Sequence, residues 1–413
     1  MEPMAVSPTA SAESPGVPPR PSLVSDSGPG ARTPTAVAGR RLGRYQLRYE
    51  VARGGMAAVF LAQLSSSAGF EKWVAIKTIH PHVASDARFV KMFLDEARLA
   101  ARIDHPNVAT VFDFGEDSGV YYLAMEYLHG EPLSEVARAA WRGGSFPIAA
   151  AAKIIAETAR GLHAAHELRA VDGGLAGVVH RDVSPQNIFV LFNGVSKIVD
   201  FGIARSNEQR GDITGTGEIK GKLAYMSPEQ MSQGFVDRRT DVWALGVVLW
   251  ELLAGRRLFK RDTDARTMMA VINDPIPSIE TLRADCPDGL REIVHTALQR
   301  APNGRYSDAA RMAHALERFL AQGGTPMGPA EVERFMRGLF AIQIDQRQLL
   351  LAVPIESSLE STERVALPSS RRAEAARAAS SIVTTDLYTT FGVAALLGVS
   401  AVVAIAGLVA LLR

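Results

Sequence analysis

The spacing of the apolar residues changes near residue 130, and this change constrains the fold more than any other feature of the sequence. Before it, short apolar runs at residues 45–52, 57–64 and 73–79 have the length of strands. After it, apolar residues recur mainly at helical spacing, and a last amphipathic helix is expected at residues 329–351. A strand-rich stretch followed by a helix-rich one predicts an α+β protein with two lobes.

The same reasoning gives the remaining elements. Further strands are expected at residues 108–114 and 120–127 and within 188–200. Helices are expected at residues 87–102, 149–168, 241–254, 267–272, 290–299 and 308–321. Residues 168–177, which are rich in glycine, predict a surface loop.

Charge and cysteine content exclude several classes of protein. The net charge is +1, so no overall field recruits nucleic acid, and no nucleic-acid partner is predicted. The single cysteine, Cys286, rules out an internal disulfide, fits a reducing compartment and is interpreted as a packing residue. No apolar segment follows Met1, so a cleaved signal peptide is not expected.

An uncharged apolar run near the C-terminus predicts a membrane span. Residues 391–412 form 22 positions without a charge. A helix of that length measures about 33 Å, against about 30 Å for the hydrocarbon core of a bilayer. The alternative is a buried core helix, but such helices seldom lack a polar face over this length. We therefore expect a single transmembrane helix and a lipid bilayer as partner.

The residues around this run predict orientation and pairing. Arg371, Arg372 and Arg377 precede it, which favours a cytoplasmic location for everything before the span. Ala394 and Gly398 are four residues apart, a spacing that would support a homodimer through the membrane helix. Small residues are so frequent here that chance explains the spacing equally well.

Short motifs with known chemistry follow one another in one order. They are VAIK ending at Lys77, HRDVSPQN at 180–187, DFG at 200–202, SPE at 227–229 and DVWALG at 241–246. Over residues 45–320 this order resembles the protein kinase family, specifically the eukaryotic-type (Hanks-type) serine/threonine kinases of bacteria. The resemblance implies a bilobal fold with a small β-rich lobe and a larger helical lobe. It also implies transfer of the γ-phosphate of ATP to serine or threonine of protein substrates.

The resemblance assigns five catalytic positions. Lys77 would contact the α- and β-phosphates, and Glu96, on the helix at 87–102, would hold Lys77 in place. Asp200 and Asn187 would supply oxygen ligands to Mg²⁺. Asp182 would accept the proton of the substrate hydroxyl. Phosphoryl transfer needs positioning and charge neutralisation, which these residue types provide.

A glycine turn and an adenine pocket are implied as well. The predicted ATP-binding residues are Ala52, Arg53, Gly54, Gly55, Met56, Ala57, Val59, Ala75, Lys77, Glu126 and Leu128. In the family pattern GxGxxGxV the first and third glycines are Ala52 and Ala57 here, and only Gly54 is kept. Val59 and Ala75 would cover the adenine and Met125 would be the gatekeeper, with the backbone near 126–128 bonding the base.

Two positions depart from the family pattern near the catalytic aspartate. Serine/threonine kinases usually have lysine two residues after it, where this chain has Ser184. The threonine expected before the SPE motif is Lys222, whose side chain would reach toward the region that Ser184 leaves uncharged. SPE replaces the more common APE, and Glu229 is expected to form a buried ion pair with Arg305.

Regulation is expected in the segment 200–229. Arg181 is the residue that often receives a phosphate from this segment in the family. Thr214 and Thr216 are the predicted sites of autophosphorylation, with ordinary loop residues as the alternative.

The predicted layout along the chain has five parts. They are a disordered segment at 1–40, a kinase domain at 41–325 (lobes 41–130 and 131–325), a helical extension at 326–352, a polar linker at 353–390 and a transmembrane helix at 391–412. This layout predicts a single-pass protein of the bacterial inner membrane with a cytoplasmic kinase domain. The first alternative is a membrane-tethered pseudokinase that binds nucleotide without efficient transfer. A small-molecule kinase is the second, disfavoured because residues 225–230 resemble a peptide-docking loop.

Overall fold

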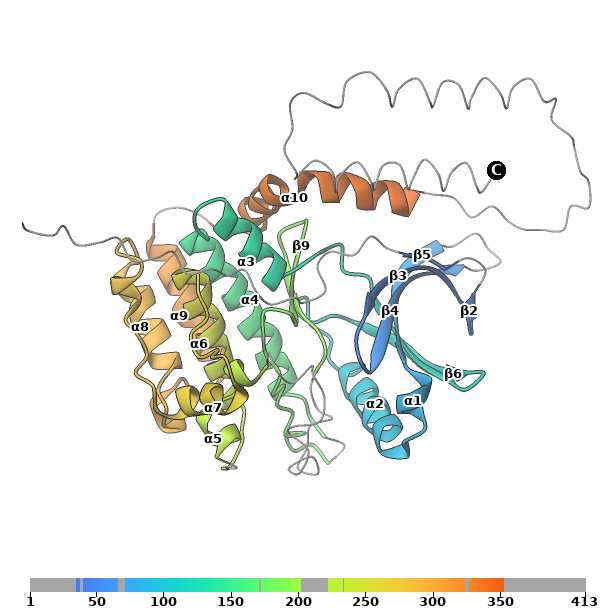
Figure 1. The fold of residues 1–413 in the computed structure, drawn as a ribbon, viewed down its shortest axis with the longest axis horizontal. Coiled ribbons are helices and arrows are strands. Elements are labelled where there is room, and N and C mark those ends of the chain that lie inside the picture. Colours follow the sequence, from blue (N-terminus) through green and yellow to red (C-terminus); the bar gives the residue numbers. More distant parts are fainter. Residues whose placement is uncertain are drawn as a thin grey trace, which may run out of the picture. The chain divides into compact units, whose positions relative to one another are not determined.

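The computed structural model describes residues 35–37, 40–65, 71–170, 172–201, 222–232, 234–323 and 327–352. Its strands and helices separate into a β-rich lobe and a helical lobe, drawn in blue to cyan and in green to orange in Figure 1. The predicted bilobal α+β architecture is confirmed.

An antiparallel sheet forms the N-terminal lobe. Its strands are β1 (Thr35–Ala36), β2 (Arg41–Leu42), β3 (Tyr45–Arg53), β4 (Ala57–Ser65), β5 (Glu71–Ile79), β6 (Val111–Asp117) and β7 (Val120–Glu126). The order is β1-β3-β4-β5-β7-β6, with β2 paired to β3. Helices α1 (Pro81–Ala84) and α2 (Ala87–Ala100) follow β5. The Asp86 carboxylate accepts a hydrogen bond from the Arg88 N–H and so caps the start of α2.

Alternation of side chains explains the core of this lobe. Along β5, Val74 and Ile76 are buried while the residues between them are less so, as a strand with one covered face requires. They pack with aromatic side chains such as Tyr45, Phe60 and Tyr122. The rings of Tyr45 and Tyr122 meet edge to face with centroids 5.9 Å apart.

The C-terminal lobe is mostly helical. Its α-helices are α3 (Leu133–Arg142), α4 (Ile148–His166), α5 (Pro228–Met231), α6 (Arg239–Ala254), α7 (Asp264–Asn273), α8 (Asp288–Ala297), α9 (Ala309–Gln322) and α10 (Pro329–Ala352). Short 3₁₀ turns occupy Leu223–Tyr225 (η4), Ile279–Thr281 (η5) and Pro302–Gly304 (η6). A small antiparallel sheet contains β8 (Gly130–Pro132), β9 (Ile188–Leu191) and β10 (Ser196–Ile198) in the order β10-β9-β8.

Helix α6 is the centre of this lobe. Every residue from Thr240 to Leu253 is buried, which explains why its sequence has no polar face. The indole N–H groups of Trp243 and Trp250 donate to the carbonyls of Met226 and Pro277, so both buried rings have a polar partner. The helix ends at Gly255, whose φ of +67° favours glycine.

Backbone bonds join the two lobes behind the site. The Ala109 N–H donates to Ile198 O, and the Ile198 N–H donates to Asn107 O, across the bridge between Val108 and Ile198. Val108 therefore pairs with β10, and β6 begins only at Val111. The predicted start of this strand at Val108 was wrong.

Helix α10 follows the core helices and is kinked. Phe340 has the non-helical angles φ −132° and ψ 27°, and Val332, Met336, Phe340 and Ile344 are buried. The Arg347 guanidinium pairs with Glu131 at 2.6 Å and donates to Gly130 O, so α10 contacts β8 directly after the connection between the lobes.

Most other predicted elements agree with the structure within a few residues. The predicted strand at 120–127 and the helices at 149–168, 241–254 and 308–321 correspond to β7, α4, α6 and α9. Helix α3 was not predicted as a separate element. Within residues 168–177, the described part forms a tight turn in which the Ala170 N–H donates to Gly174 O. Cys286 is buried and not disulfide-bonded, as the packing interpretation predicts.

Candidate active site

Lys77, Glu96 and Asp200 meet between the lobes. Lys77 on β5 has its Nζ 2.7 Å from Asp200 Oδ1 and 3.9 Å from Glu96 Oε1 on α2. The predicted lysine–glutamate pair is therefore present but long, and Asp200 is the closer partner. Asp200 follows Lys77 by 123 positions in the sequence, so the cluster joins segments that are distant along the chain.

Charge and burial shift the pKa values of this cluster. Burial alone would lower the pKa of Lys77, but the carboxylates of Asp200 and Glu96 outweigh burial and raise it above its usual range. Burial would raise the pKa of Asp200, but Lys77 lowers it below its ordinary value. Burial raises the pKa of Glu96 to about 7, because Lys77 lies closer to Asp200 and compensates Glu96 incompletely.

The strand register brings the predicted adenine-covering residues together. Val59 on β4 lies opposite Lys77 on β5, and Ala75 on β5 lies opposite Met125 on β7. Directly opposed residues share a face of a sheet, and Ala75 and Lys77 are two positions apart. Val59, Ala75, Lys77 and Met125 therefore lie on one face.

The predicted glycine turn is short and needs no left-handed backbone. Ala52 and Ala57 lie in strands β3 and β4, and the Gly54 N–H donates to Ala57 O at 2.8 Å. None of residues 52–57 has a positive φ, so alanine at the first and third glycine positions causes no backbone strain. Arg53 is bound to the Glu50 carboxylate on the exposed side of β3.

His80 fixes this turn, a role that the sequence did not reveal. Its N–H donates to Met56 O at 2.9 Å, and its ring Nε2 lies 2.9 Å from Gly54 O. The start of α1 thus positions the backbone predicted to cover the phosphates.

The connection between the lobes contains backbone N–H groups that are not bound to acceptors in the described part of the chain. The Glu126 N–H donates to Thr110 O, and the Glu126 carboxylate binds Lys197 Nζ at 2.8 Å. Within the described part of the chain, the Leu128 N–H donates to no protein acceptor. It fits the prediction that the backbone near residues 126–128 bonds an adenine.

The catalytic loop places Asp182 and Asn187 side by side. The Asn187 Nδ2 donates to Asp182 Oδ2 at 3.1 Å and to the Asp182 carbonyl at 2.8 Å. Because the amide nitrogen is used in this way, the amide oxygen of Asn187 is available as a ligand. With Asp200 it would supply two oxygens, and Mg²⁺ usually takes its others from phosphate and water. These residues fit a magnesium–nucleotide complex.

A buried aspartate that was not predicted as functional holds this loop. Asp241, at the start of α6, accepts from the backbone N–H groups of His180 and Arg181 and from His166 Nε2, each at 2.8 Å. Burial would raise the pKa of Asp241, but the hydrogen bond and charge of His166 lower it. Arg181 has a φ of +63°, so Asp241 stabilises a backbone conformation that costs free energy.

Ser184 and Lys222 are both near Asp182. Ser184 is buried, and its Oγ has no hydrogen-bond partner among the described residues. Lys222 Nζ lies 2.6 Å from Asp182 Oδ2, so the base carries an ammonium group as a neighbour instead of the expected hydroxyl.

The predicted ion pair between Glu229 and Arg305 is present and nearly buried. Both guanidinium Nη atoms contact the carboxylate oxygens of Glu229 at 2.7 Å. Thr240 also donates to Glu229 at 2.8 Å. Ser227 and Gln230 cap α5 reciprocally, and Gln230 Nε2 donates to Arg181 O at 3.3 Å. The SPE motif is thereby attached to the catalytic loop.

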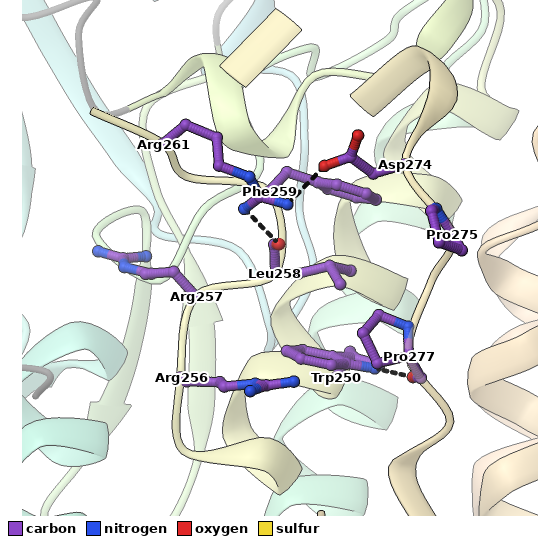
Figure 2. A pocket seen from close by; sticks show the side chains of 9 residues that line it. All are labelled: Trp250, Arg256, Arg257, Leu258, Phe259, Arg261, Asp274, Pro275 and Pro277. Atoms are coloured by element: carbon purple, nitrogen blue, oxygen red, sulfur yellow. Dashed lines mark hydrogen bonds and ion pairs between the residues drawn. The ribbon is translucent and has the colours of Figure 1, made fainter. Parts of the chain in front are cut away.

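One small cavity lies in the site, and a larger one lies elsewhere in the C-terminal lobe. The smaller, of about 20 Å³, lies among residues that include Glu96, Met125, Asp200 and Phe201, which places Met125 at the back of the site. Figure 2 shows the larger, of about 370 Å³, which is lined in part by Trp250 of α6. Its lining residues are Trp250, Arg256, Arg257, Leu258, Phe259, Arg261, Asp274, Pro275 and Pro277. Arg257 also contacts the Tyr225 hydroxyl, so this pocket adjoins η4.

Several predictions lie outside the described residues. They include Thr214 and Thr216 and the transmembrane helix at 391–412. Among the helices that the structure describes, none combines the length and apolar character needed to cross a membrane.

Comparison with known proteins gives the family. Residues 45–318 match the protein kinase domain model. The chain belongs to the protein kinase family. The tyrosine-protein kinase MasK of Myxococcus xanthus is 42% identical over 72% of this chain. Two serine/threonine-protein kinases, PrkC of Bacillus subtilis and PknA of Mycobacterium tuberculosis, are 31% and 35% identical over 77% and 70% of it.

A solved kinase structure has the same fold. The PknI kinase domain of Mycobacterium tuberculosis aligns with a TM-score of 0.52 and 26% identity, over 69% of this chain and 99% of that domain. The predicted membership of the bacterial Hanks-type protein kinases is confirmed. This chain spans 46%, 45% and 64% of the lengths of MasK, PrkC and PknA.

Proposed function

We propose that this chain is an ATP- and Mg²⁺-dependent protein kinase that phosphorylates serine or threonine hydroxyls of protein substrates. One observation carries the proposal: the five residues assigned to phosphate, metal and hydroxyl meet from four separate segments. Lys77 lies 2.7 Å from Asp200, and Asn187 lies 3.1 Å from the Asp182 carboxylate. A chain that only bound nucleotide would not need the base and both metal ligands together.

The division of labour follows from this geometry. When bound, Mg²⁺ would neutralise charge on the β- and γ-phosphates, held by Asp200 and the amide oxygen of Asn187. Lys77 would exchange part of its contact with Asp200 for the α- and β-phosphates. The substrate oxygen attacks the γ-phosphorus, the bond to the β-phosphate oxygen breaks with its electron pair, and the hydroxyl proton passes to Asp182.

The test is transfer of labelled phosphate from Mg-ATP to a generic basic protein by the full chain in detergent. We expect label with the wild type and a fall of about 10²- to 10⁴-fold for Asp182→Asn, the usual contribution of a general base. A folded, ATP-binding wild type that labels no more than this variant would support the tethered pseudokinase instead.

Tyrosine specificity is the second candidate, and two observations favour it. MasK, 42% identical over 299 residues, is named as a tyrosine-protein kinase, and the serine/threonine pattern of lysine at 184 is absent here. Analysis of the phosphoamino acids in the labelled substrate decides between them. Phosphoserine or phosphothreonine supports the main proposal, whereas phosphotyrosine alone supports the second.

We also propose that residues 391–412 anchor the chain in the bacterial inner membrane with the kinase domain in the cytoplasm. The uncharged length of 22 residues and the arginines before it support this placement. The full chain should remain in the membrane fraction after a carbonate wash, whereas a chain ending at residue 390 should not. Equal release of both would contradict anchoring by this segment.

A further inference from the structure

The ammonium group beside the catalytic base comes from an unexpected position. Lys222 lies 40 residues after Asp182, directly before η4, and its Nζ is 2.6 Å from Asp182 Oδ2. The Lys222 side chain is 23% exposed and that of Asp182 only 9%. A charged contact this short and this well covered is stronger than an exposed surface pair.

The position that would normally carry the lysine holds a small hydroxyl. Ser184 is buried two residues after Asp182, and its Oγ has no hydrogen-bond partner among the described residues. The family pattern places lysine at 184 and a hydroxyl residue at 222, and this chain has the reverse. The ammonium group is still present beside Asp182, but it comes from the other of these two positions in the sequence.

Lys222 is a second cation in a site that gathers three carboxylates. Asp182, Asp200 and Glu96 bring three carboxylates to the place where phosphates would enter. Lys77 is engaged by two of them, at 2.7 Å from Asp200 and 3.9 Å from Glu96. Lys222 also lowers the pKa of Asp200, after the larger effects of burial and Lys77, so its charge acts beyond Asp182. Lys222 gives the third carboxylate, Asp182, a cation at 2.6 Å.

We propose that Lys222 replaces the missing lysine at 184 as the cation on the substrate side of the phosphoryl transfer. The proposal rests on the kinase function proposed above. Lys222 keeps the Asp182 carboxylate oriented, and it offsets charge on the phosphoryl group as it moves toward the substrate oxygen. It transfers no proton itself, because the proton of the substrate hydroxyl goes to Asp182. In this chain the cation is therefore carried by the segment that ends at SPE and not by the catalytic loop.

The test compares Lys222→Met with a matched lysine elsewhere. Lys153 on α4 is also 23% exposed and pairs at 3.0 Å with Glu157, which is 10% exposed. In the full chain, Lys222→Met should lower kcat about 10²-fold with little change in the KM for ATP, the size of effect seen when one donor to developing charge is removed. Lys153→Met should leave both constants unchanged, and thermal unfolding of both variants checks that they fold.

An exchange of residues separates a catalytic effect from a structural one. Lys222→Thr should lose activity as Lys222→Met does, and the double variant Ser184→Lys, Lys222→Thr should recover at least part of kcat. Recovery is expected only if the reaction needs a positive charge near Asp182, whichever of the two positions supplies it. No recovery in a folded double variant would overturn the proposal.

The other outcomes are also decisive. An unchanged kcat in Lys222→Met, or a loss confined to the KM for ATP, would overturn the proposal while leaving the kinase function intact. A higher kcat would show that the ammonium blocks the base, which also overturns it. A wild type that transfers no phosphate would overturn both the kinase function and the role of Lys222.

Discussion

The two halves of the active site are held by different kinds of interaction. In the C-terminal lobe, Asp241 accepts three hydrogen bonds of 2.8 Å and fixes the loop before Asp182. In the N-terminal lobe, Glu96 reaches Lys77 only at 3.9 Å. The Asp241 carboxylate has its hydrogen-bond partners within the buried core of the protein. The contacts of Lys77 instead depend on the balance between its charge and two carboxylates, which the phosphates of a nucleotide would change.

This difference separates a preorganised half from an adjustable one. Strain at Arg181, with a φ of +63°, persists because the buried carboxylate of Asp241 holds the surrounding backbone. Lys77 rests on Asp200 at 2.7 Å, a contact for which phosphate oxygens would compete. We therefore expect changes in the C-terminal half to affect folding, and changes in the N-terminal half to affect nucleotide use.

The largest loss of stability is expected from the substitution Asp241→Ala. The substitution leaves two backbone N–H groups and His166 without their acceptor in a buried site, so the free energy of unfolding should fall by about 3–5 kcal/mol. Urea unfolding measures this. The control is Asp237→Ala in the loop before α6, whose carboxylate pairs with Arg239 nearer the surface and should cost about 1 kcal/mol or less. Equal losses would show that the C-terminal half is not specially held.

The titration of Glu96 should affect both the free energy of unfolding and kcat/KM for ATP, which tests the adjustable half of the site. Burial raises its pKa to about 7 from an ordinary value of 4.5, so ionisation of Glu96 is unfavourable in the folded protein. The free energy of unfolding should fall as pH rises from about 4.5 to about 7. Over the same window kcat/KM for ATP should rise, because only ionised Glu96 can pair with Lys77.

Glu96→Gln should reduce the fall in the free energy of unfolding, of which buried Glu251 would still supply a part, and should give a low and flat kcat/KM. The matched control is Glu280→Gln, which changes an exposed carboxylate paired with Arg291 at 2.7 Å and should leave both profiles as in the wild type. Chemical unfolding and initial rates at a series of pH values provide the measurements. A variant that keeps the rise in kcat/KM would show that another group controls it.

The smallest loss of stability is expected where α10 contacts the connection between the lobes. Arg347→Ala removes a pair with the largely buried Glu131 at 2.6 Å and should cost about 1–3 kcal/mol. Arg337→Ala on the same helix removes an exposed pair with Glu333 at 3.2 Å and should cost about 0.5 kcal/mol or less. The midpoints of urea unfolding compare the two variants. Equal losses would show that the Arg347–Glu131 pair does not stabilise the connection between the lobes.

Local sequence predicted most of the elements and the side chains that we propose to be catalytic. The motifs around Lys77, Asp182 and Asp200 could be read directly, because each is a short run whose residue types suit one task in phosphoryl transfer. The strand pattern of β5 and the amphipathic α2 were also readable, because their periods are local. The two-lobed architecture followed from the change of period near residue 130.

Tertiary structure alone decided the partners of these groups. The preference of Lys77 for Asp200, the support of the strained loop by Asp241, and the contact of Lys222 with Asp182 join residues 40 to 123 positions apart. No local pattern specifies such distances, since they depend on how the sheet and α6 pack. The sequence therefore named the groups proposed for the chemistry, because their motifs are local. Packing set which charges meet and at what distance, because it brings together residues that are far apart along the chain.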